Sequence, residues 1–131
     1  MKNRVVVIAV ALLVVFLAGF LPEFSRAQRL EGEVRDVRQQ VALSQLRDLA
    51  ALTFLEASQK NYGLAASTSS QFFTRTRDLA NQTADPARKK SLEDLLTVRD
   101  QITAELAKGD PAVWNDLQNL FVKTRQATGG L

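Results

Sequence analysis

The chain has 131 residues, enough for one packed domain and too few for two substantial ones. Hydrophobic residues make up 46% of it and charged residues 24%, so a core is expected and disorder throughout is excluded. The absence of cysteine and histidine removes disulfides, thiol chemistry, the commonest catalytic base and the commonest transition-metal ligands.

The positive charge of the chain does not indicate nucleic-acid binding. The net charge is +3 overall, but beyond residue 22 there are 15 Lys and Arg against 14 Asp and Glu, a net of +1. This balance gives no electrostatic footprint for a polyanion. We therefore expect no nucleic acid among the partners.

The first element is an uncharged run at residues 5–21, "VVVIAVALLVVFLAGFL". Its 17 residues are at the lower limit for a helix that crosses a bilayer. Lys2 and Arg4 precede it, and basic flanks tend to stay in the cytoplasm. The pattern predicts a cytoplasmic tail at 1–4 and a transmembrane signal anchor at 5–22, in contact with the lipid bilayer. The rest would then lie on the extracytoplasmic side, periplasmic or extracellular.

A cleaved secretory signal is the alternative for the same segment. In "FSRAQ", Ser25 and Ala27 fit the small-residue pattern of a signal-peptidase site, and cleavage after Ala27 would release a secreted helical protein. The apolar run exceeds the usual length of about 7–15 residues for the core of a signal peptide. The length favours the anchor.

The next segment, residues 23–41, is predicted to be a helical stalk. Its apolar residues follow the 3, 4, 3, 4 spacing of a coiled-coil seam, which ends because Ser44 and Asp48 occupy the next two seam positions. If two stalks pair in parallel, Arg26 faces Glu31 and Glu33 faces Arg38, both pairs opposite in sign. The candidate interface, for a protein partner or a parallel homodimer, consists of Ala27, Leu30, Val34, Val37, Val41, Glu33 and Arg38.

The stalk helix is predicted to continue to about residue 60 and to enter a bundle. Asn61 and Gly63 favour a turn near 61–63, and a helix that runs through Gly63 is the alternative. Further helices are predicted at about 64–82, 86–108 and 111–127. Asp85 and Asp110 mark the corners between these helices as predicted N-caps, and Gly109 marks a corner as a predicted left-handed helix end.

The apolar pattern also predicts which side chains of these helices face inward. In the first helix they are Leu43, Leu46, Leu49, Ala50, Leu52, Thr53, Phe54, Leu55 and Ala57. In the second they are Ala65, Ser69, Phe72, Phe73, Thr76, Leu79 and Ala80. In the last two they are Leu92, Leu95, Leu96, Val98, Ile102, Leu106, Val113, Trp114, Leu117, Leu120 and Phe121.

Short connections make neighbouring helices antiparallel. The predicted fold is therefore all-α, with an N-terminal transmembrane helix continuing into a long stalk helix and an antiparallel four-helix bundle over 42–131. At the helical rise, residues 24–60 span roughly 55 Å and the later helices roughly 25–35 Å. This difference leaves residues 24–41 without a partner in their own chain.

No catalytic, cofactor-binding or metal-binding motif is present, so we expect no enzyme and no cofactor. The pattern favours a non-enzymatic, single-pass membrane protein that acts through protein–protein contacts, as a scaffold or an accessory subunit of a membrane complex. The alternative is an extracytoplasmic ligand-sensing bundle. For that function, the Ser/Thr-rich stretch "STSSQFFTRT" from Ser67 would line a polar cavity between the first two helices of the bundle, although small residues more often let helices approach.

Overall fold

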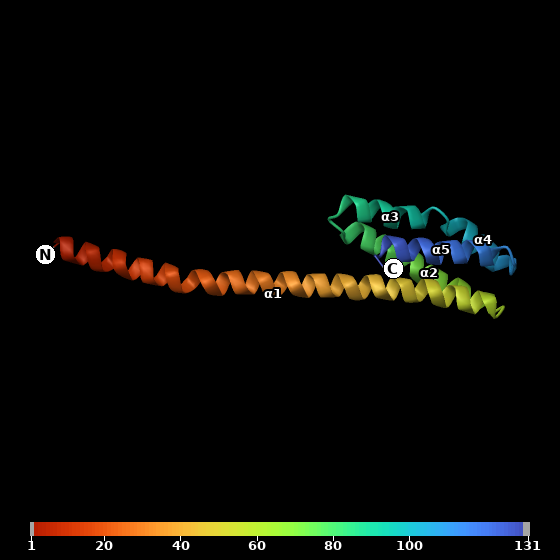
Figure 1. The fold of residues 1–131 in the computed structure, drawn as a ribbon, viewed down its shortest axis with the longest axis horizontal. Coiled ribbons are helices and arrows are strands. Elements are labelled where there is room, and N and C mark those ends of the chain that lie inside the picture. The colour runs from red at the N-terminus through yellow and green to blue at the C-terminus, as the bar shows by residue number, and fades with distance from the viewer. Residues whose placement is uncertain (1, 130–131) are drawn as a thin grey trace. The chain divides into compact units, whose positions relative to one another are not determined.

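The computed structural model describes the backbone of residues 2–129 and the side chains of residues 3–16 and 29–129. Over this range the chain is all-α and has no strand. Its helices are α1 (Lys2–Ser58), α2 (Tyr62–Gln82), α3 (Pro86–Leu96), α4 (Arg99–Lys108) and α5 (Val113–Ala127) (Figure 1). The chain divides into two compact units, Met1–Gln39 and Gln40–Leu131, and the division falls within α1.

The first unit is the N-terminal part of α1, in which the described large hydrophobic side chains are exposed. Among the described residues, no helix has an apolar stretch long enough to cross a membrane. The anchor predicted at 5–22 extends into residues 17–28, whose side chains lie outside the described ones. Arg26 and Ala27, from the predicted interface, lie outside them too.

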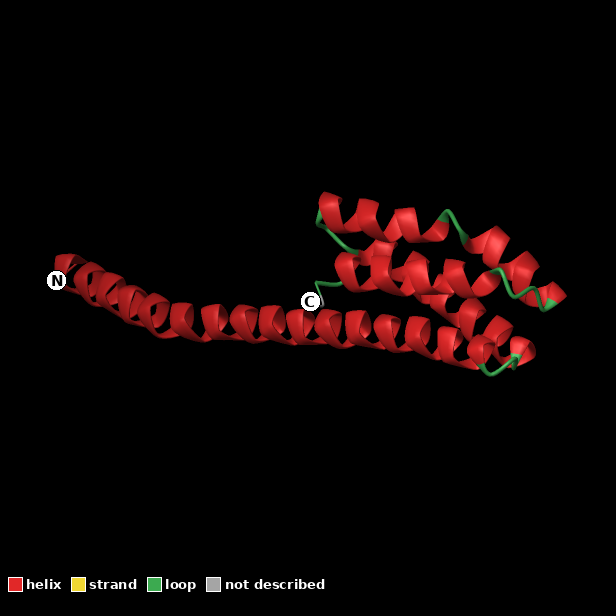
Figure 2. Cartoon of the chain, turned by 45° about the vertical axis from the view of Figure 1, so that its right-hand side comes forward, coloured by secondary structure: helices red, strands yellow, loops and turns green. Residues whose placement is uncertain are grey.

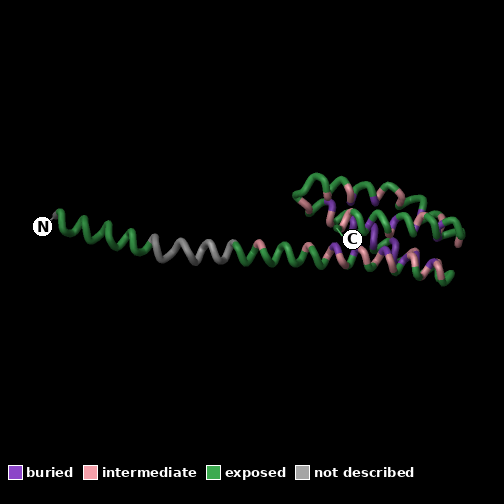
Figure 3. The backbone as a smooth tube through the Cα atoms, in the orientation of Figure 1, coloured by how far each residue is buried: buried purple, intermediate pink, exposed green. Residues whose placement is uncertain are grey.

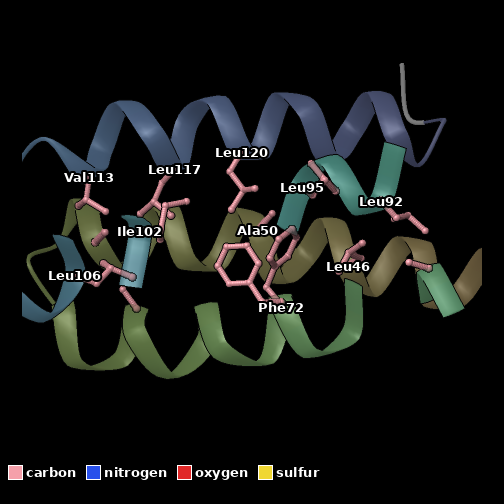
Figure 4. Close-up of a cluster of buried hydrophobic side chains, with 14 residues drawn as sticks. Leu46, Ala50, Phe72, Leu92, Leu95, Ile102, Leu106, Val113, Leu117 and Leu120 are labelled. Carbon is pink, nitrogen blue, oxygen red and sulfur yellow. The ribbon is translucent and has the colours of Figure 1, made fainter. Parts of the chain in front are cut away.

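The second unit is a helical bundle built around one hydrophobic core. The last turns of α1 and all four later helices contribute to it, and the buried segments of Figure 3 mark where they meet. Figure 4 shows side chains from all five helices converging around Phe72. The buried core residues are Leu46, Ala50, Ala57, Ala65, Phe72, Phe73, Ala80, Leu92, Leu95, Ile102, Leu106, Val113, Leu117 and Leu120.

The turn between α1 and α2 lies earlier than predicted, at residues 59–61, and Gly63 belongs to the first turn of α2. The Asn61 amide donates to the Glu56 carbonyl and the Lys60 amide to the Ala57 carbonyl, both at 2.9 Å. This pair of bonds is a Schellman motif, which needs a left-handed residue. Lys60 adopts that conformation with φ 64°. The turn is therefore shifted by about two residues from the predicted one: Asn61 belongs to it, as expected, but Gly63 does not.

The helix predicted over 86–108 is two helices, so the bundle has one helix more than expected (Figure 2). Both the amide and the hydroxyl of Thr97 donate to the Asp94 carbonyl, at 3.4 and 2.7 Å, which tightens the chain to an i−3 turn. The helix resumes at Arg99. In an unbroken helix, Arg99 would share the inward face of Leu95 and Ile102. In the structure it is exposed and pairs with Asp100 at 2.9 Å.

The predicted corners are confirmed at Asp85 and Gly109, whereas Asp110 is not the N-cap of the last helix as predicted, because Ala112 holds that position in α5 without a side-chain cap bond. Asp85 caps α3 by accepting from the Ala87 amide at 3.0 Å, and Gly109 ends α4 with φ 63°. The Asp110 carboxylate accepts from the Ala112 amide at 2.9 Å. A short i−3 turn follows, so α5 begins at Val113 rather than at residue 111.

Most of the predicted inward side chains are buried or packed against the core, including the whole predicted set from α2. The prediction was wrong for Leu52 and Leu55, which are exposed: Leu55 lies on the side of α1 opposite the buried Leu46, and Leu52 borders a surface groove between α1 and α2. It was also wrong for Trp114, which is 38% exposed. Its indole N–H reaches the Ala57 carbonyl at 3.1 Å and thereby joins α5 to the end of α1.

Candidate functional site

The candidate site is the apolar seam of the stalk, residues Leu30, Val34, Val37 and Val41 among those whose side chains are described. Their exposed fractions are 62%, 47%, 58% and 50%. In a helix, residues at this spacing fall on one face, and α1 is helical throughout this stretch. The first three belong to the unit Met1–Gln39 and Val41 to the unit Gln40–Leu131.

The charged side chains beside the seam are exposed as well. Glu31, Arg35 and Arg38 border a shallow surface groove that also contains Leu30 and Val34. Glu33 and Arg38 are exposed, and neither has an ion-pair partner among the described residues, where the one such pair joins Arg99 and Asp100. These charges remain available to a partner.

The polarity of α1 changes where the seam ends. Ser44 is half-buried and Asp48 is exposed, at the next two positions of the heptad. Leu43 is the first buried side chain of α1 in the bundle, and Leu46 and Ala50 follow on the same side. Beyond residue 42 the apolar residues that pack therefore no longer follow the spacing of the seam, and they lie on a different face of α1 from the exposed Val41 of the same unit.

The Ser/Thr-rich stretch of α2 divides between two faces. Thr68, Ser69 and Thr76 are buried, whereas Ser70 and Thr74 are exposed. Ser70 donates to the Ala66 carbonyl at 3.0 Å and Thr74 to the Ser70 carbonyl at 2.9 Å. Exposed hydroxyls bonded to their own helix are not directed into the interior of the bundle. Together with Ser67, they border a shallow surface hollow on α2.

A polar groove lies between α1 and α2 in the bundle, where the ligand-sensing alternative expected a cavity, but Ser67, Ser70 and Thr74 do not line it. Leu49 and Leu52 form its apolar part, and the polar residues are Gln45, Asp48, Gln71 and Arg75. Its lining residues come from two consecutive helices, so periodicity within one helix carries no signal for it. Its lining is open to solvent and contains no close ion pair between described residues.

Within the described residues, no group of three or more acidic side chains is placed to hold a metal ion. The chain matches no protein-family model, no curated protein and no solved structure.

Proposed function

We propose that this chain is a non-enzymatic, single-pass membrane protein that presents a helical bundle on the extracytoplasmic side and acts through protein–protein contacts. In this proposal residues 5–22 form the anchor, residues 23–41 form the stalk, and residues 42–131 form an antiparallel bundle. A scaffold or an accessory subunit of a membrane complex fits these parts. The observation that carries the proposal is the exposed apolar seam of the stalk.

The anchor is supported by the composition and exposure of the N-terminal segment. Residues 5–21 contain no polar side chain, and every large hydrophobic residue among 5–16 is more than half exposed. A continuous apolar surface of this kind is unfavourable in water and favourable in lipid. Lys2 and Arg4 support an orientation with the N-terminus in the cytoplasm.

The contact function is supported by the surface of the stalk. A row of exposed Leu and Val at coiled-coil spacing, flanked by opposite charges, is typical of a helix that pairs with another helix. Isolated exposed apolar residues are ordinary on protein surfaces, but a contiguous row favours an interaction site.

A non-enzymatic function is supported by the side chains available. Without histidine or cysteine, general base and nucleophilic chemistry would depend on carboxylates, lysines or hydroxyls. The exposed hydroxyls of Ser70, Thr74 and Thr103 are each bonded to a carbonyl of their own helix. None of these three is paired with a neighbouring base.

The anchor is tested by fractionating cells that express the full chain, washing the membranes with alkaline carbonate and sequencing the N-terminus of the retained protein. We expect the chain in the washed membrane pellet with its N-terminus before residue 5. A soluble chain that begins at Gln28 would refute the anchor and support the secreted form. A variant with Leu13→Arg and Val14→Arg is the matched control, since charges in mid-segment should release the chain.

A further inference from the structure

We propose that the partner of the stalk seam is a second copy of this chain, aligned in parallel, so that the protein is a dimer joined through residues 30–41. This inference rests on the proposed function, because the shared membrane fixes the orientation. Leu30 and Val37 would occupy the d positions of the coiled coil, and Val34 and Val41 the a positions. Each of these side chains is available for packing, since about half or more of its surface is exposed.

The flanking charges select a copy of the same chain. In a parallel pair, a g residue faces the e residue five positions later on the partner helix. Glu33 at g therefore meets Arg38 of the other chain, and the two-fold axis repeats the pair. Neither residue has an ion-pair partner among the described residues of its own chain, so pairing breaks no existing bridge there.

The polarity at the end of the seam limits the pairing to the stalk. In a longer parallel coil, Asp48 would lie in the a layer, where the two carboxylates would face each other. Burying unpaired like charges is strongly unfavourable. The Ser44 layer before it adds little apolar contact. Two heptads therefore pair, and the helices separate where each stalk enters its own bundle.

A coil of about two heptads buries only a few apolar side chains, so pairing through it alone is weak. Two anchors in one bilayer keep the stalks at high local concentration and with their N-termini on the same side, which favours the parallel arrangement. We therefore expect pairing in membranes to exceed pairing of the same stalks free in solution.

Single cysteines provide a direct test, because the natural chain contains no cysteine. Val34→Cys and Val37→Cys place a thiol in the seam, while Asp36→Cys and Gln39→Cys place one on the outer face of the helix. Native membranes carrying each variant receive a brief oxidising pulse, and disulfide dimers are measured by non-reducing electrophoresis. We expect dimers for the two seam variants and little dimer for the two outer variants.

The charge pair is tested in the Val34→Cys background. Glu33→Arg and Arg38→Glu, each alone, create like-charge contacts at both symmetry-related sites and should lower the dimer yield about fivefold. The two substitutions together restore opposite charges and should restore the yield. In an antiparallel pair, residues 33 and 38 would not face each other through this g-to-e relation, and the double variant would not be rescued.

The outcomes separate this inference from the proposed function. Equal dimer yields at all four positions, or seam crosslinks only to a different protein, would overturn the homodimer. A chain that stays in washed membranes but forms no seam dimer would overturn it too and leave the anchor standing. Conversely, seam dimers of a chain found outside the membrane would support the pairing and refute the anchor. A soluble chain without seam dimers would refute both.

Discussion

Gly109 and Gly63 occupy opposite kinds of backbone. Gly109 has φ 63° at the end of α4, where its amide donates to the Leu106 carbonyl at 3.1 Å and the Asp110 amide donates to the Glu105 carbonyl at 3.0 Å. A Cβ at this position would lie 3.3 Å from Cδ2 of Tyr62. Gly63 lies within α2, and a Cβ there would meet nothing within 4 Å.

We therefore expect alanine to have opposite effects at these two positions. Gly109→Ala should lower the free energy of unfolding by about 1–2 kcal/mol, because L residues are strained in the left-handed region. Gly63→Ala should raise it by up to about 1 kcal/mol, because alanine restricts the unfolded chain and favours a helix. Urea unfolding followed by circular dichroism measures both. A loss of stability in both variants, or in neither, would contradict the assigned conformations.

The hydrogen bond from Trp114 to the Ala57 carbonyl gives a second test at a single residue. Trp114→Phe keeps an aromatic ring but removes the N–H donor. Because the Ala57 carbonyl also accepts from the Lys60 amide at 2.9 Å, it is not left unpaired. We expect a loss of about 0.5–1.5 kcal/mol in unfolding free energy, measured by thermal and urea denaturation. An unchanged stability would mean that this bond contributes nothing in solution.

The conformation of a single residue can be predicted from the sequence when the type of that residue alone favours it. Gly109 and Asp85 are the preferred types for a left-handed helix end and an N-cap, and both positions were predicted. Lys60 is not such a type, so the true end of α1 had no local signal. The indole contact of Trp114 joins residues 57 positions apart, and no pattern within one helix reports it.

The part of α1 in the bundle has two apolar sides with different environments. Leu46 is fully buried (0% exposed), whereas Leu55 is 52% exposed. At about 3.6 residues per turn these two positions lie on opposite sides of the helix. The sequence analysis predicted that both leucines face inward. Apolar residues occur around most of this part of α1, so their positions do not show which side of the helix packs against the bundle.

Alanine substitutions at these two leucines test the packing of α1. Leu46→Ala should lower the free energy of unfolding by about 2–5 kcal/mol, because it leaves a cavity in the core. Leu55→Ala should change it by less than about 1 kcal/mol, since much of that side chain is already in water. Both variants are measured by urea denaturation of the full chain in detergent micelles. Similar losses of stability for Leu46→Ala and Leu55→Ala would contradict this expectation and show that the Leu55 side of α1 is covered.

The break between α3 and α4 has no glycine or proline to mark it. Thr97 and Val98 are adjacent β-branched residues, which lower helix propensity only slightly. The hydroxyl bond from Thr97 to the Asp94 carbonyl adds a local competitor to the helix ladder. Each of these local effects is weak. They occur just before Arg99, which a continuous helix would turn inward. The break could be predicted from the sequence only by combining the weak local preference with the cost of burying Arg99.

For the whole molecule, the candidate seam was predictable because its signal is periodic and local to one helix. Leu30, Val34 and Val37 were identified from spacing, and the structure leaves them exposed. The ligand-sensing alternative expected a cavity between the first two helices, but the residues that line the groove there were not predictable, because Asp48 and Arg75 come together only through packing. The partner of the seam is decided by contacts outside the chain, so its identity is a proposal.

The orientation of the whole chain in a membrane is tested most directly by labelling single cysteines with a maleimide that does not cross the bilayer. Ser67→Cys on the exposed face of the bundle and Asn3→Cys in the first turn of α1 are the matched positions. In intact cells, with any outer envelope layer made permeable and the cytoplasmic membrane sealed, we expect labelling at position 67 and protection at position 3. Lysis should then expose position 3. Protection of position 67 in sealed cells, with labelling only after lysis, would contradict the account.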